Sequence, residues 1–348
     1  MLTNNRSRGL LRLAIAAVAM VASLSVAWGQ VLVAPGAWQT MAPAPDLRTE
    51  ASVTTDGDRL YLLGGFTQLS DGSTAAALPV HAYDPASNTW SHLTDLPEGV
   101  NHAGLVYLDG ALYVVGGNRG DTFSPTDRVM VYDLATDRWR DGPALPTARS
   151  ALSVVVLCGR IHAIGGSISN GVDTGAHEIF HPASGVWTAA AEMPTPRNHH
   201  AAAAVGNEVI VVAGRDTASF TLTANETYSA ATDSWRTGAP VPTGRSGVAA
   251  VALEGRVYLF GGEAPTGTFD AAEGYEPLTD AWVTLPPMPT ARHGLGAATI
   301  DGLIYVASGG PQPGFAFSNL NERLDPHPDR DSKLPAKTGP AEACGLAR

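Results

Sequence analysis

Arginine recurs at one position of a repeating unit in this chain of 348 residues. It follows a short turn that contains proline and precedes an apolar run, and the six equivalent positions read Arg48, Val100, Arg149, Arg197, Arg245 and Arg292. Guanidinium groups bind carboxylates and phosphates in a bidentate manner, so several of them around one opening would form an anion site. The alternative is that each arginine pairs with an acidic residue inside the protein.

A second recurring position separates these alternatives. Two residues before a position that is usually aromatic stand His81, Met130, Glu178, Glu226, Glu273 and Glu322. The last four units have both Arg and Glu, whereas the second unit has Val100 and Met130, so both charges are lost together. Joint loss favours direct contact, and we therefore expect four structural Arg–Glu ion pairs. Arg48 faces His81 instead of a glutamate, which would leave it free to meet an outside anion.

The residue two places after the arginine position offers acid–base chemistry. Across the units it is Glu50, His102, Ala151, His199, Gly247 and Gly294. Glu50 and His102 form the only such acid–base pair in neighbouring units, and carboxylate and imidazole groups transfer protons near neutral pH. Irregularity in a regular array often marks function, although drift at solvated positions is the alternative. The predicted ligand-binding residues are Arg48, Glu50, His81, Asn101 and His102.

The units that must position these residues repeat about every 50 residues. Tryptophan recurs at intervals of 47 to 52 residues, at Trp38, Trp90, Trp139, Trp187, Trp235 and Trp282. Residue pairs that end in glycine recur with the same period, at Gly64-Gly65, Gly116-Gly117, Gly165-Gly166, Ala213-Gly214, Gly261-Gly262 and, in looser register, Gly309-Gly310. Each unit holds four short β-rich runs, a to d, which predict one four-stranded antiparallel sheet. This period with four strands is typical of a propeller blade.

The Gly-Gly pairs, the Tyr-Asp-Pro run at residues 83–85 and Trp90 resemble the kelch-repeat β-propellers over roughly residues 38–325. The resemblance implies an all-β, six-bladed kelch β-propeller whose d–a and b–c loops open on one face, around the mouth of a central channel. The arginine position and the next two residues would then ring that mouth. The first b–c loop, residues 66–79, is the longest and adjoins Arg48 and Glu50.

Closure of the ring follows from the ends of the pattern. Trp38 has no glycine pair before it, and the last glycine pair has no tryptophan after it. Residues 31–40 are therefore expected to supply strand d of the blade whose other strands come from residues 292–326. Closure hides both edges of the ring. The predicted propeller domain is residues 30–326.

The propeller pattern also sets the expectation for metals. His102, His199 and His293 come from alternate blades, and His293 is one position out of register, so its side chain should point off the opposite face of its strand. Zinc needs nitrogen ligands at ~2.0–2.1 Å, which residues spread around a channel rarely achieve. The sequence therefore predicts no metal site and no cofactor.

The two ends of the chain differ from the propeller in composition. Residues 1–29 are typical of a secretory signal, with Arg6, Arg8 and Arg12 before an apolar run at 13–27. We expect a secreted or periplasmic protein with no membrane span after cleavage; an uncleaved anchor is the alternative. Residues 327–348 are expected to form a disordered tail. Cys158 and Cys344, the two cysteines, either pair in an oxidising compartment or stay apart.

Charge argues against nucleic-acid partners. The formal net charge is −11, and the lysines, Lys333 and Lys337, lie in the predicted tail. Such a surface repels phosphate backbones, so no nucleic acid is expected as a partner.

Two functions remain open. The leading hypothesis is an exported kelch-repeat binding module that presents a site for a protein or glycan ligand on the d–a/b–c loop face. The alternative is a carbohydrate-active enzyme resembling the periplasmic kelch sialic-acid mutarotases or epimerases, in which Glu50 and His102 transfer protons and Arg48 holds a carboxylate. Convergence of Glu50 and His102 in a closed pocket would favour the enzyme, and an open rim would favour the binding module.

Overall fold

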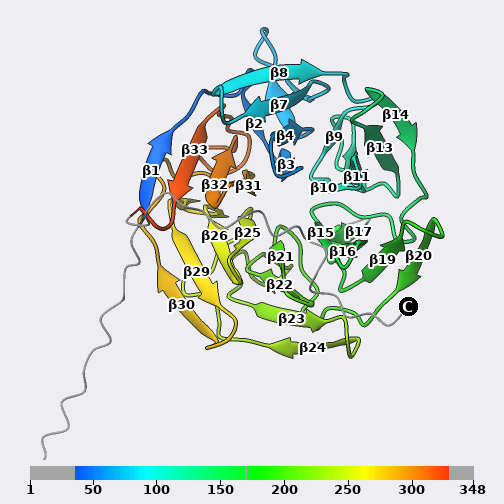
Figure 1. Ribbon diagram of the computed structural model, residues 1–348, viewed down its shortest axis with the longest axis vertical. Helices are drawn as coiled ribbons and strands as arrows, with labels where there is room; N and C mark the ends of the chain where they lie inside the picture. Colours follow the sequence, from blue (N-terminus) through cyan, green and yellow to red (C-terminus); the bar gives the residue numbers. More distant parts are fainter. Residues whose placement is uncertain (1–35, 169–170, 329–348) are drawn as a thin grey trace, which may run out of the picture. The chain divides into compact units, whose positions relative to one another are not determined.

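The computed structural model describes residues 36–168 and 171–328. Within these residues, six four-stranded antiparallel sheets follow one another around a ring (Figure 1). The first strand of each sheet lies nearest the centre, and strands a to d are hydrogen-bonded in that order. The chain is therefore an all-β propeller, as the repeat predicts.

The strands of the first three blades, each from the centre outwards, are β3 (Ser52–Thr55), β4 (Leu60–Leu63), β7 (Val80–Asp84) and β8 (Thr89–Leu93); β10 (Gly104–Leu108), β11 (Ala111–Val115), β13 (Val129–Asp133) and β14 (Arg138–Asp141); and β15 (Ser153–Leu157), β16 (Arg160–Ile164), β19 (His177–His181) and β20 (Val186–Ala189). Those of the last three are β21 (Ala201–Val205), β22 (Glu208–Val212), β23 (Asn225–Ser229) and β24 (Ser234–Thr237); β25 (Ala249–Leu253), β26 (Arg256–Phe260), β29 (Ala272–Glu276) and β30 (Ala281–Thr284); and β31 (Gly296–Ile300), β32 (Leu303–Ala307), β33 (Asn321–Asp325) and β1 (Ala37–Thr40).

The last blade takes its outer strand from the other end of the propeller. β1 pairs antiparallel with β33, with Trp38 opposite Leu324. The indole N–H of Trp38 donates to the carbonyl of Pro286, 2.9 Å away, and β3 contacts β31 across the join. This is the closure that the ends of the repeat predict. The strands run from Ala37 to Asp325.

Tryptophan and tyrosine wedge the blades together. Tyr132 packs on Trp139 with ring centroids 4.9 Å apart, and the indole N–H of Trp139 donates to the carbonyl of Thr94 in the preceding blade. Trp90, Trp187, Trp235 and Trp282 make the same kind of hydrogen bond to the blade before their own. Each repeat thus supplies an apolar wedge and a polar link to its neighbour, which explains why tryptophan recurs.

The glycine pairs leave room for the next blade. Gly116 and Gly117 have φ values of 63° and 92°, and a Cβ on Gly116 would lie 2.6 Å from the carbonyl oxygen of Arg149 in the following blade. The N–H of Gly117 donates to that same carbonyl at 2.9 Å. In the last blade the equivalent donor is Gly309, which bonds the carbonyl of Arg48 at 3.0 Å. The pair there is Ser308-Gly309, so the expected register of Gly309-Gly310 was wrong by one residue.

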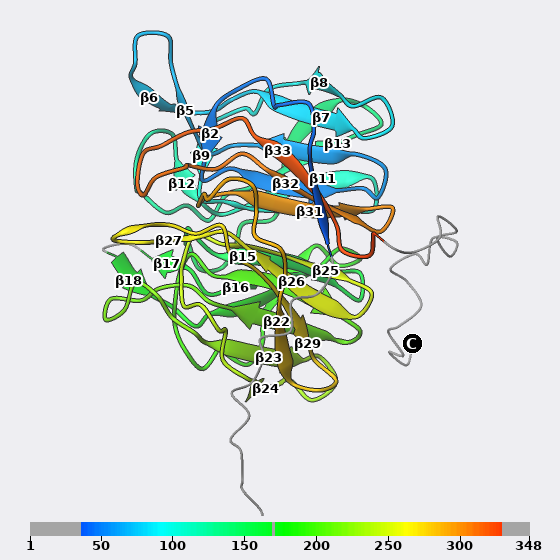
Figure 2. The ribbon, with the colours of Figure 1, turned by 90° about the vertical axis from the view of Figure 1, so that its left-hand side faces the viewer.

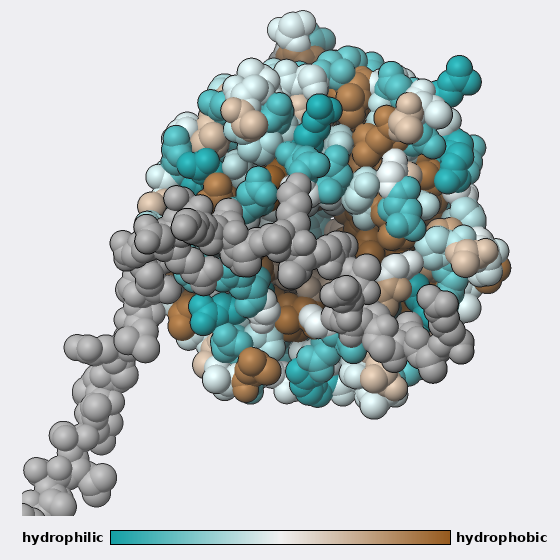
Figure 3. Space-filling model, viewed as in Figure 1, coloured by the Kyte–Doolittle hydropathy of each residue, from teal (hydrophilic) through white to brown (hydrophobic). Residues whose placement is uncertain are grey.

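The connecting loops carry the remaining strands. They are β2 (Arg48–Thr49), β5 (Phe66–Gln68) and β6 (Thr74–Ala76), then β9 (Val100–Asn101) and β12 (Asn118–Arg119), then β17 (Ser167–Ile168) and β18 (Val172–Asp173), and β27 (Glu263–Ala264) and β28 (Gly267–Thr268). Figure 2 shows those it labels on one face of the ring, with the β5–β6 hairpin extending beyond the other loops. We call this the loop face. Figure 3 shows the opposite face, where hydrophobic residues are visible between polar ones around the middle.

Some predictions fall wholly or partly outside the described residues. The predicted signal sequence at residues 1–29 lies outside them, as does the predicted tail apart from residues 327 and 328. Cys158, in the turn between β15 and β16, is disulfide-bonded, whereas Cys344 lies outside the described residues. Within the described ranges, no helix is long and apolar enough to cross a membrane.

Candidate functional site

The predicted Arg–Glu pairs are present and buried. Each side chain of the four arginines is 0% exposed, and the pairs are Arg149–Glu178, Arg197–Glu226, Arg245–Glu273 and Arg292–Glu322. Val100 and Met130, which replace this pair in the second blade, are buried in one apolar cluster. These positions are structural, because none of the four guanidinium groups is open to an outside anion.

Arg48 is not free, and this expectation from the sequence was wrong. Its side chain is also 0% exposed, and it forms an ion pair of 2.7 Å with Asp46. The same carboxylate lies 2.8 Å from Nε2 of His81, which is itself buried. Although partial burial opposes it, the hydrogen bonds from Arg48 and His81 lower the pKa of Asp46 below its ordinary value. Arg48 and His81 therefore hold the first blade together and do not line the channel mouth.

The sequence contained a signal for this exchange. Asp46 lies two residues before Arg48, where the last four blades have Thr147, Thr195, Thr243 and Thr290. In the third blade, Thr147 donates to Glu178, the residue that also pairs with the arginine. In the first blade the carboxylate that pairs with arginine thus lies in the loop before strand a instead of in strand c. His81 occupies the strand-c position that is glutamate in the last four blades.

A ring of left-handed residues forms the channel mouth. Glu50, His102, Ala151, His199, Gly247 and Gly294 have φ values between 51° and 64°. Backbone hydrogen bonds link them in order from Glu50 to Gly294: the N–H of Ala151, for example, donates to the carbonyl of His102, and that of His199 to the carbonyl of Ala151. This arrangement brings the six positions close to the axis, where side chains from alternate blades meet. Four of the six carry a side chain at a φ that favours glycine, and such strain is common at functional sites.

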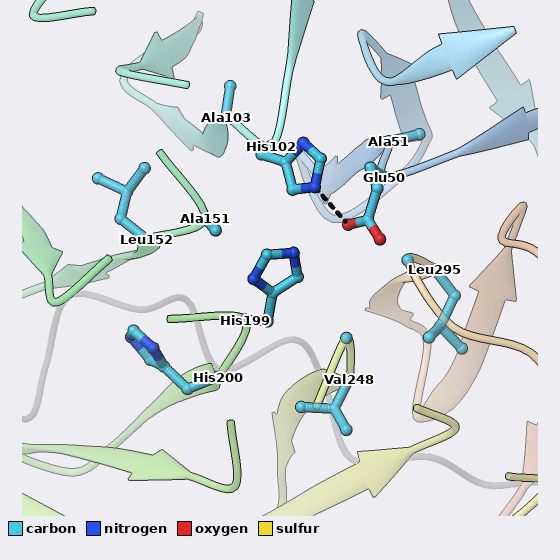
Figure 4. Close-up of a pocket in the computed structure, with 12 residues that line it drawn as sticks. Glu50, Ala51, His102, Ala103, Ala151, Leu152, His199, His200, Val248 and Leu295 are labelled. Carbon is cyan, nitrogen blue, oxygen red and sulfur yellow. Dashed lines mark ion pairs between the residues drawn. The ribbon is translucent and has the colours of Figure 1, made fainter. Parts of the chain in front are cut away.

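Glu50, His102 and His199 point toward one another in this ring (Figure 4). Oε2 of Glu50 lies 3.6 Å from Nε2 of His102, and the rings of His102 and His199 have centroids 4.9 Å apart. Glu50 and His102 are mostly buried: the side chain of His102 is 9% exposed and that of Glu50 is 15% exposed. The predicted acid–base pair therefore converges.

Asparagine fixes the orientation of each histidine. Oδ1 of Asn101 lies 2.6 Å from Nδ1 of His102 and also accepts from the amide of Asn118 at 3.0 Å. Asn101 is 0% exposed, so its role is to position His102 and not to contact a ligand directly. Asn198 contacts Nδ1 of His199 in the same way. Because the oxygen of an amide only accepts, each imidazole carries its proton on Nδ1 and presents the lone pair of Nε2 to the channel mouth.

The geometrical reasons for expecting no metal site are contradicted. Nε2 of His293 lies 3.6 Å from Glu50 and 3.5 Å from Glu263, so its side chain reaches the mouth despite its shifted register. One ligand atom each from Glu50, His102 and His199 lie within 4.8 Å of one another. Sequence reasoning assumed a wide channel, whereas the hydrogen-bonded ring makes it narrow.

Glu50, His102 and His199 line one side of a cavity of about 250 Å³. Its wall is aromatic: Phe66 lies 5.1 Å from Phe315 and 5.9 Å from Phe123, between ring centroids. Arg215 and Glu263 form an ion pair of 2.9 Å at its side, and Arg215 also donates to Nε2 of His199 at 2.9 Å. The result is a pocket with a polar floor and an apolar wall, a combination suited to a small polar ligand.

Sequence reasoning missed these wall residues, although three of them share a position. The residue after each glycine pair reads Phe66, Asn118, Ser167, Arg215, Glu263 and, in the corrected register, Gly310. Backbone pairing places this residue beside the channel mouth, as between Asn198 and Arg215. The position is as irregular as the ring itself and was a usable signal. Phe123, Phe220 and Phe315 share a second position, six residues after the last residue of the glycine pair, once the register of the last pair is corrected.

Burial sets the protonation of the histidines here. It lowers the pKa of His102, although Glu50 opposes the shift. Burial, together with Arg215 and the neighbouring histidines, lowers the pKa of His199 well below 6.5. Both are therefore neutral near pH 7, ready to accept a proton or to bind a cation.

His200 provides a test through pH. It lies at a position that is otherwise apolar (Ala51, Ala103, Leu152, Val248, Leu295), and burial lowers its pKa to about 3. An unfolded histidine, with pKa near 6.5, binds a proton first, so the stability associated with neutral His200 is complete above pH 6.5 and is lost as pH falls from 6.5 toward 3. Between pH 7 and pH 5 the free energy of unfolding falls in the wild type. In the variant His200→Leu this fall is expected to be smaller by about 2 kcal/mol.

Denaturant titration at both pH values measures this difference. His92→Gln is the control, because the side chain of His92 is 57% exposed. That variant should follow the wild-type profile. Parallel profiles for His200→Leu and wild type would show that His200 does not contribute to acid sensitivity.

Comparisons with known proteins agree with the fold. The family profile described as "Kelch motif" matches residues 100–146 and 244–289. The chain is 32% identical over 84 residues to "Kelch-like protein terF" of Aspergillus terreus, covering 24% of this chain and 18% of that protein. It is 37% identical over 81 residues to a "Kelch domain-containing protein" of Sulfurisphaera tokodaii, covering 23% and 11%. It is 31% identical over 80 residues to "Beta-scruin" of Limulus polyphemus, covering 23% and 8%.

The matched segments thus span less than a fifth of these relatives' own length. Together with the six four-stranded blades of the described residues, these matches support a β-propeller built from kelch repeats.

Proposed function

We propose that this protein is an exported kelch-repeat binding module whose loop-face pocket takes a terminal sugar of a glycan. The observation that carries the proposal is the pairing of a polar floor, Glu50 with His102 and His199, and an aromatic wall, Phe66 with Phe123 and Phe315, in one cavity. Aromatic rings stack on the apolar face of a pyranose, while carboxylate and imidazole groups hydrogen-bond its hydroxyls.

The size of the pocket favours a glycan end over a protein surface. A cavity of about 250 Å³ lies below the range of about 300–1,000 Å³ that is usual for drug-sized ligands, so it suits a single small ring. Standard protein interfaces bury about 800 Å² on each partner, far more than such a cavity offers. A protein partner would have to use the surrounding loops, and that occupant is the alternative outcome of the test. Export is supported by the signal-like residues 1–29.

A second function, a sugar mutarotase or epimerase, is favoured by one observation. Glu50 and His102 converge in a pocket, with Nδ1 of His102 held by Asn101. A carboxylate and a neutral imidazole this close are suited to passing a proton to and from one sugar ring. The role assigned to Arg48 in this enzyme is withdrawn, because Arg48 is buried against Asp46.

The test is a glycan array probed with the secreted form of the full chain. Phe123→Ala is the informative variant, because its side chain is 65% exposed and its loss leaves the blades intact. We expect at least about tenfold weaker binding, since stacking residues dominate such sites. Leu278→Ala, at an even more exposed apolar position in a turn between strands c and d, is the control and should bind like wild type. A glycan bound equally well by Phe123→Ala would place the site elsewhere.

Turnover separates the binding module from the enzyme. NMR of the bound sugar's two anomers measures their exchange rate. Glu50→Gln should abolish any protein-dependent acceleration while leaving binding within about tenfold of wild type. Absence of acceleration by the wild type would exclude the mutarotase and leave the binding module.

A further inference from the structure

We propose that Glu50, His102 and His199 form a binding site for a divalent transition-metal ion such as Zn²⁺ at the mouth of the channel. The inference shares a pocket with the proposed function but goes beyond it, because it assigns the floor of that pocket to an ion. It stands on the geometry of these three side chains and of the residues that orient them.

The lone pair of His102 points into the channel mouth. Asn101 accepts from Nδ1 of His102 at 2.6 Å, and its own amide nitrogen donates to the carbonyls of Gly120 and Thr122, which fixes the amide the right way round. His102 therefore presents Nε2 to the mouth without a proton. Histidines that bind metal ions are held in this manner, with the second ring nitrogen donating to an oxygen.

His102 and His293 both approach the carboxylate of Glu50. Nε2 of His102 lies 3.6 Å from one oxygen of Glu50, and Nε2 of His293 lies 3.6 Å from the other. Nδ1 of His293 lies 3.2 Å from the carbonyl of Gly310, and its Nε2 faces two carboxylates, those of Glu50 and Glu263. The lone pair of His102 and the carboxylate of Glu50 repel at 3.6 Å, which is too long for a hydrogen bond. A cation between them turns the repulsion into coordination.

Glu50, His102 and His199 fit around an ion. The three candidate ligand atoms lie within 4.8 Å of one another, and Glu50 and His102 are separated by 3.6 Å. Ligand atoms at ~2.0–2.1 Å from a zinc ion in a tetrahedron lie about 3.3 Å from one another. Side-chain rotations that move the three ligand atoms by about 1 Å therefore complete the site. Two imidazoles and one carboxylate with an open fourth position resemble catalytic zinc sites and suit Zn²⁺ better than Ca²⁺ or Mg²⁺.

Arg215 is the competitor of the ion. It donates to Nε2 of His199 at 2.9 Å, and the same guanidinium pairs with Glu263 at 2.9 Å and lies 4.4 Å from the ring centroid of Phe220. An arriving ion has to replace the first contact, while the other two keep Arg215 at the side of the pocket. Removal of this positive charge should therefore tighten the binding of the ion.

The ring supplies variants that preserve the fold. Gly247 and Gly294 show that glycine is accepted at the ring positions, with φ values of 64° and 57°. His102→Gly and His199→Gly thus remove a ligand at a backbone conformation that glycine prefers. Ala151→Gly makes the same backbone change in the ring without touching a ligand and is the matched control.

The experiment is calorimetric titration of the untagged full chain, freed of metal with EDTA and desalted, with ZnCl₂ alone. We expect one equivalent bound, a Kd at least about 100-fold higher in His102→Gly and His199→Gly, and an unchanged Kd in Ala151→Gly. Arg215→Met should lower the Kd. Intense visible absorption on addition of Co²⁺ would identify four-coordinate geometry at the same site.

Two results would overturn the proposal. One is absence of binding by the wild type, and the other is binding that survives in the His102→Gly/His199→Gly double variant, which would mean an adventitious ion at other histidines. Melting curves of the variants confirm that they are folded. Because this titration contains no glycan, its failure leaves the proposed sugar site standing, and glycan binding in the presence of EDTA tests that site separately.

Discussion

Removal of residues 36–40 is expected to unfold the propeller or lower its stability by more than about 5 kcal/mol. β1 supplies the outer strand of the last blade, and without it the backbone groups of β33 that pair with Ala37 to Thr40 lose their partners. Trp38 is lost at the same time, with its edge-on contact to Phe260 at 5.8 Å and its bond to Pro286. Loss of one such wedge alone costs about 3 kcal/mol, and the bare edge of β33 invites aggregation.

Thermal melting and size-exclusion chromatography measure this result. Trp38→Ala is the control, since it keeps the strand and removes only the wedge. Its stability should lie between those of the wild type and the deletion. A deletion variant that melts like the wild type would show that β1 contributes nothing to closure.

The repeat made much of the fold predictable from one sequence, because six copies of one unit act as an internal comparison. The joint loss of charge at Val100 and Met130 indicated the four Arg–Glu pairs, and each is present as a buried contact. The unmatched Trp38 likewise indicated closure. In each case the information lies in residue types at aligned positions, which a sequence displays directly.

The site was predicted less completely, because its geometry depends on backbone conformation. The left-handed ring that brings Glu50, His102 and His199 together is built from Glu, His, Ala and Gly. This mixture of residue types does not predict a positive φ at all six positions. Register alone suggested that His293 points away, whereas its side chain reaches Glu50. Phe123 and Phe315 align with each other only after the register of the last glycine pair is corrected from Gly309-Gly310 to Ser308-Gly309. Glu50 and His102 were found because they were irregular, not because their convergence was foreseen.

Asp46→Thr is expected to destabilise the first blade, and His81→Glu is expected to restore its stability. Asp46→Thr removes the carboxylate that pairs with Arg48 at 2.7 Å and leaves a guanidinium that is 0% exposed without its acid. A stranded buried charge costs about 3–5 kcal/mol, and the partial exposure of Asp46 places this variant near 3 kcal/mol. The other bonds of Arg48, to the carbonyls of Gly64 and Pro79, remain but do not neutralise the charge.

His81→Glu, added to Asp46→Thr, rebuilds the arrangement of the third blade, where threonine and arginine both contact Glu178. Most of the lost stability should return, so the two changes should be strongly non-additive in a double-mutant cycle measured by denaturant unfolding. Zinc and glycan binding should stay at wild-type levels throughout, because Asp46, Arg48 and His81 do not line the pocket. Additive losses would mean that the acid cannot be exchanged between the two positions. A large loss of ligand binding at full stability would instead return Arg48 to the site, since only a residue that reaches the ligand weakens binding without weakening the fold.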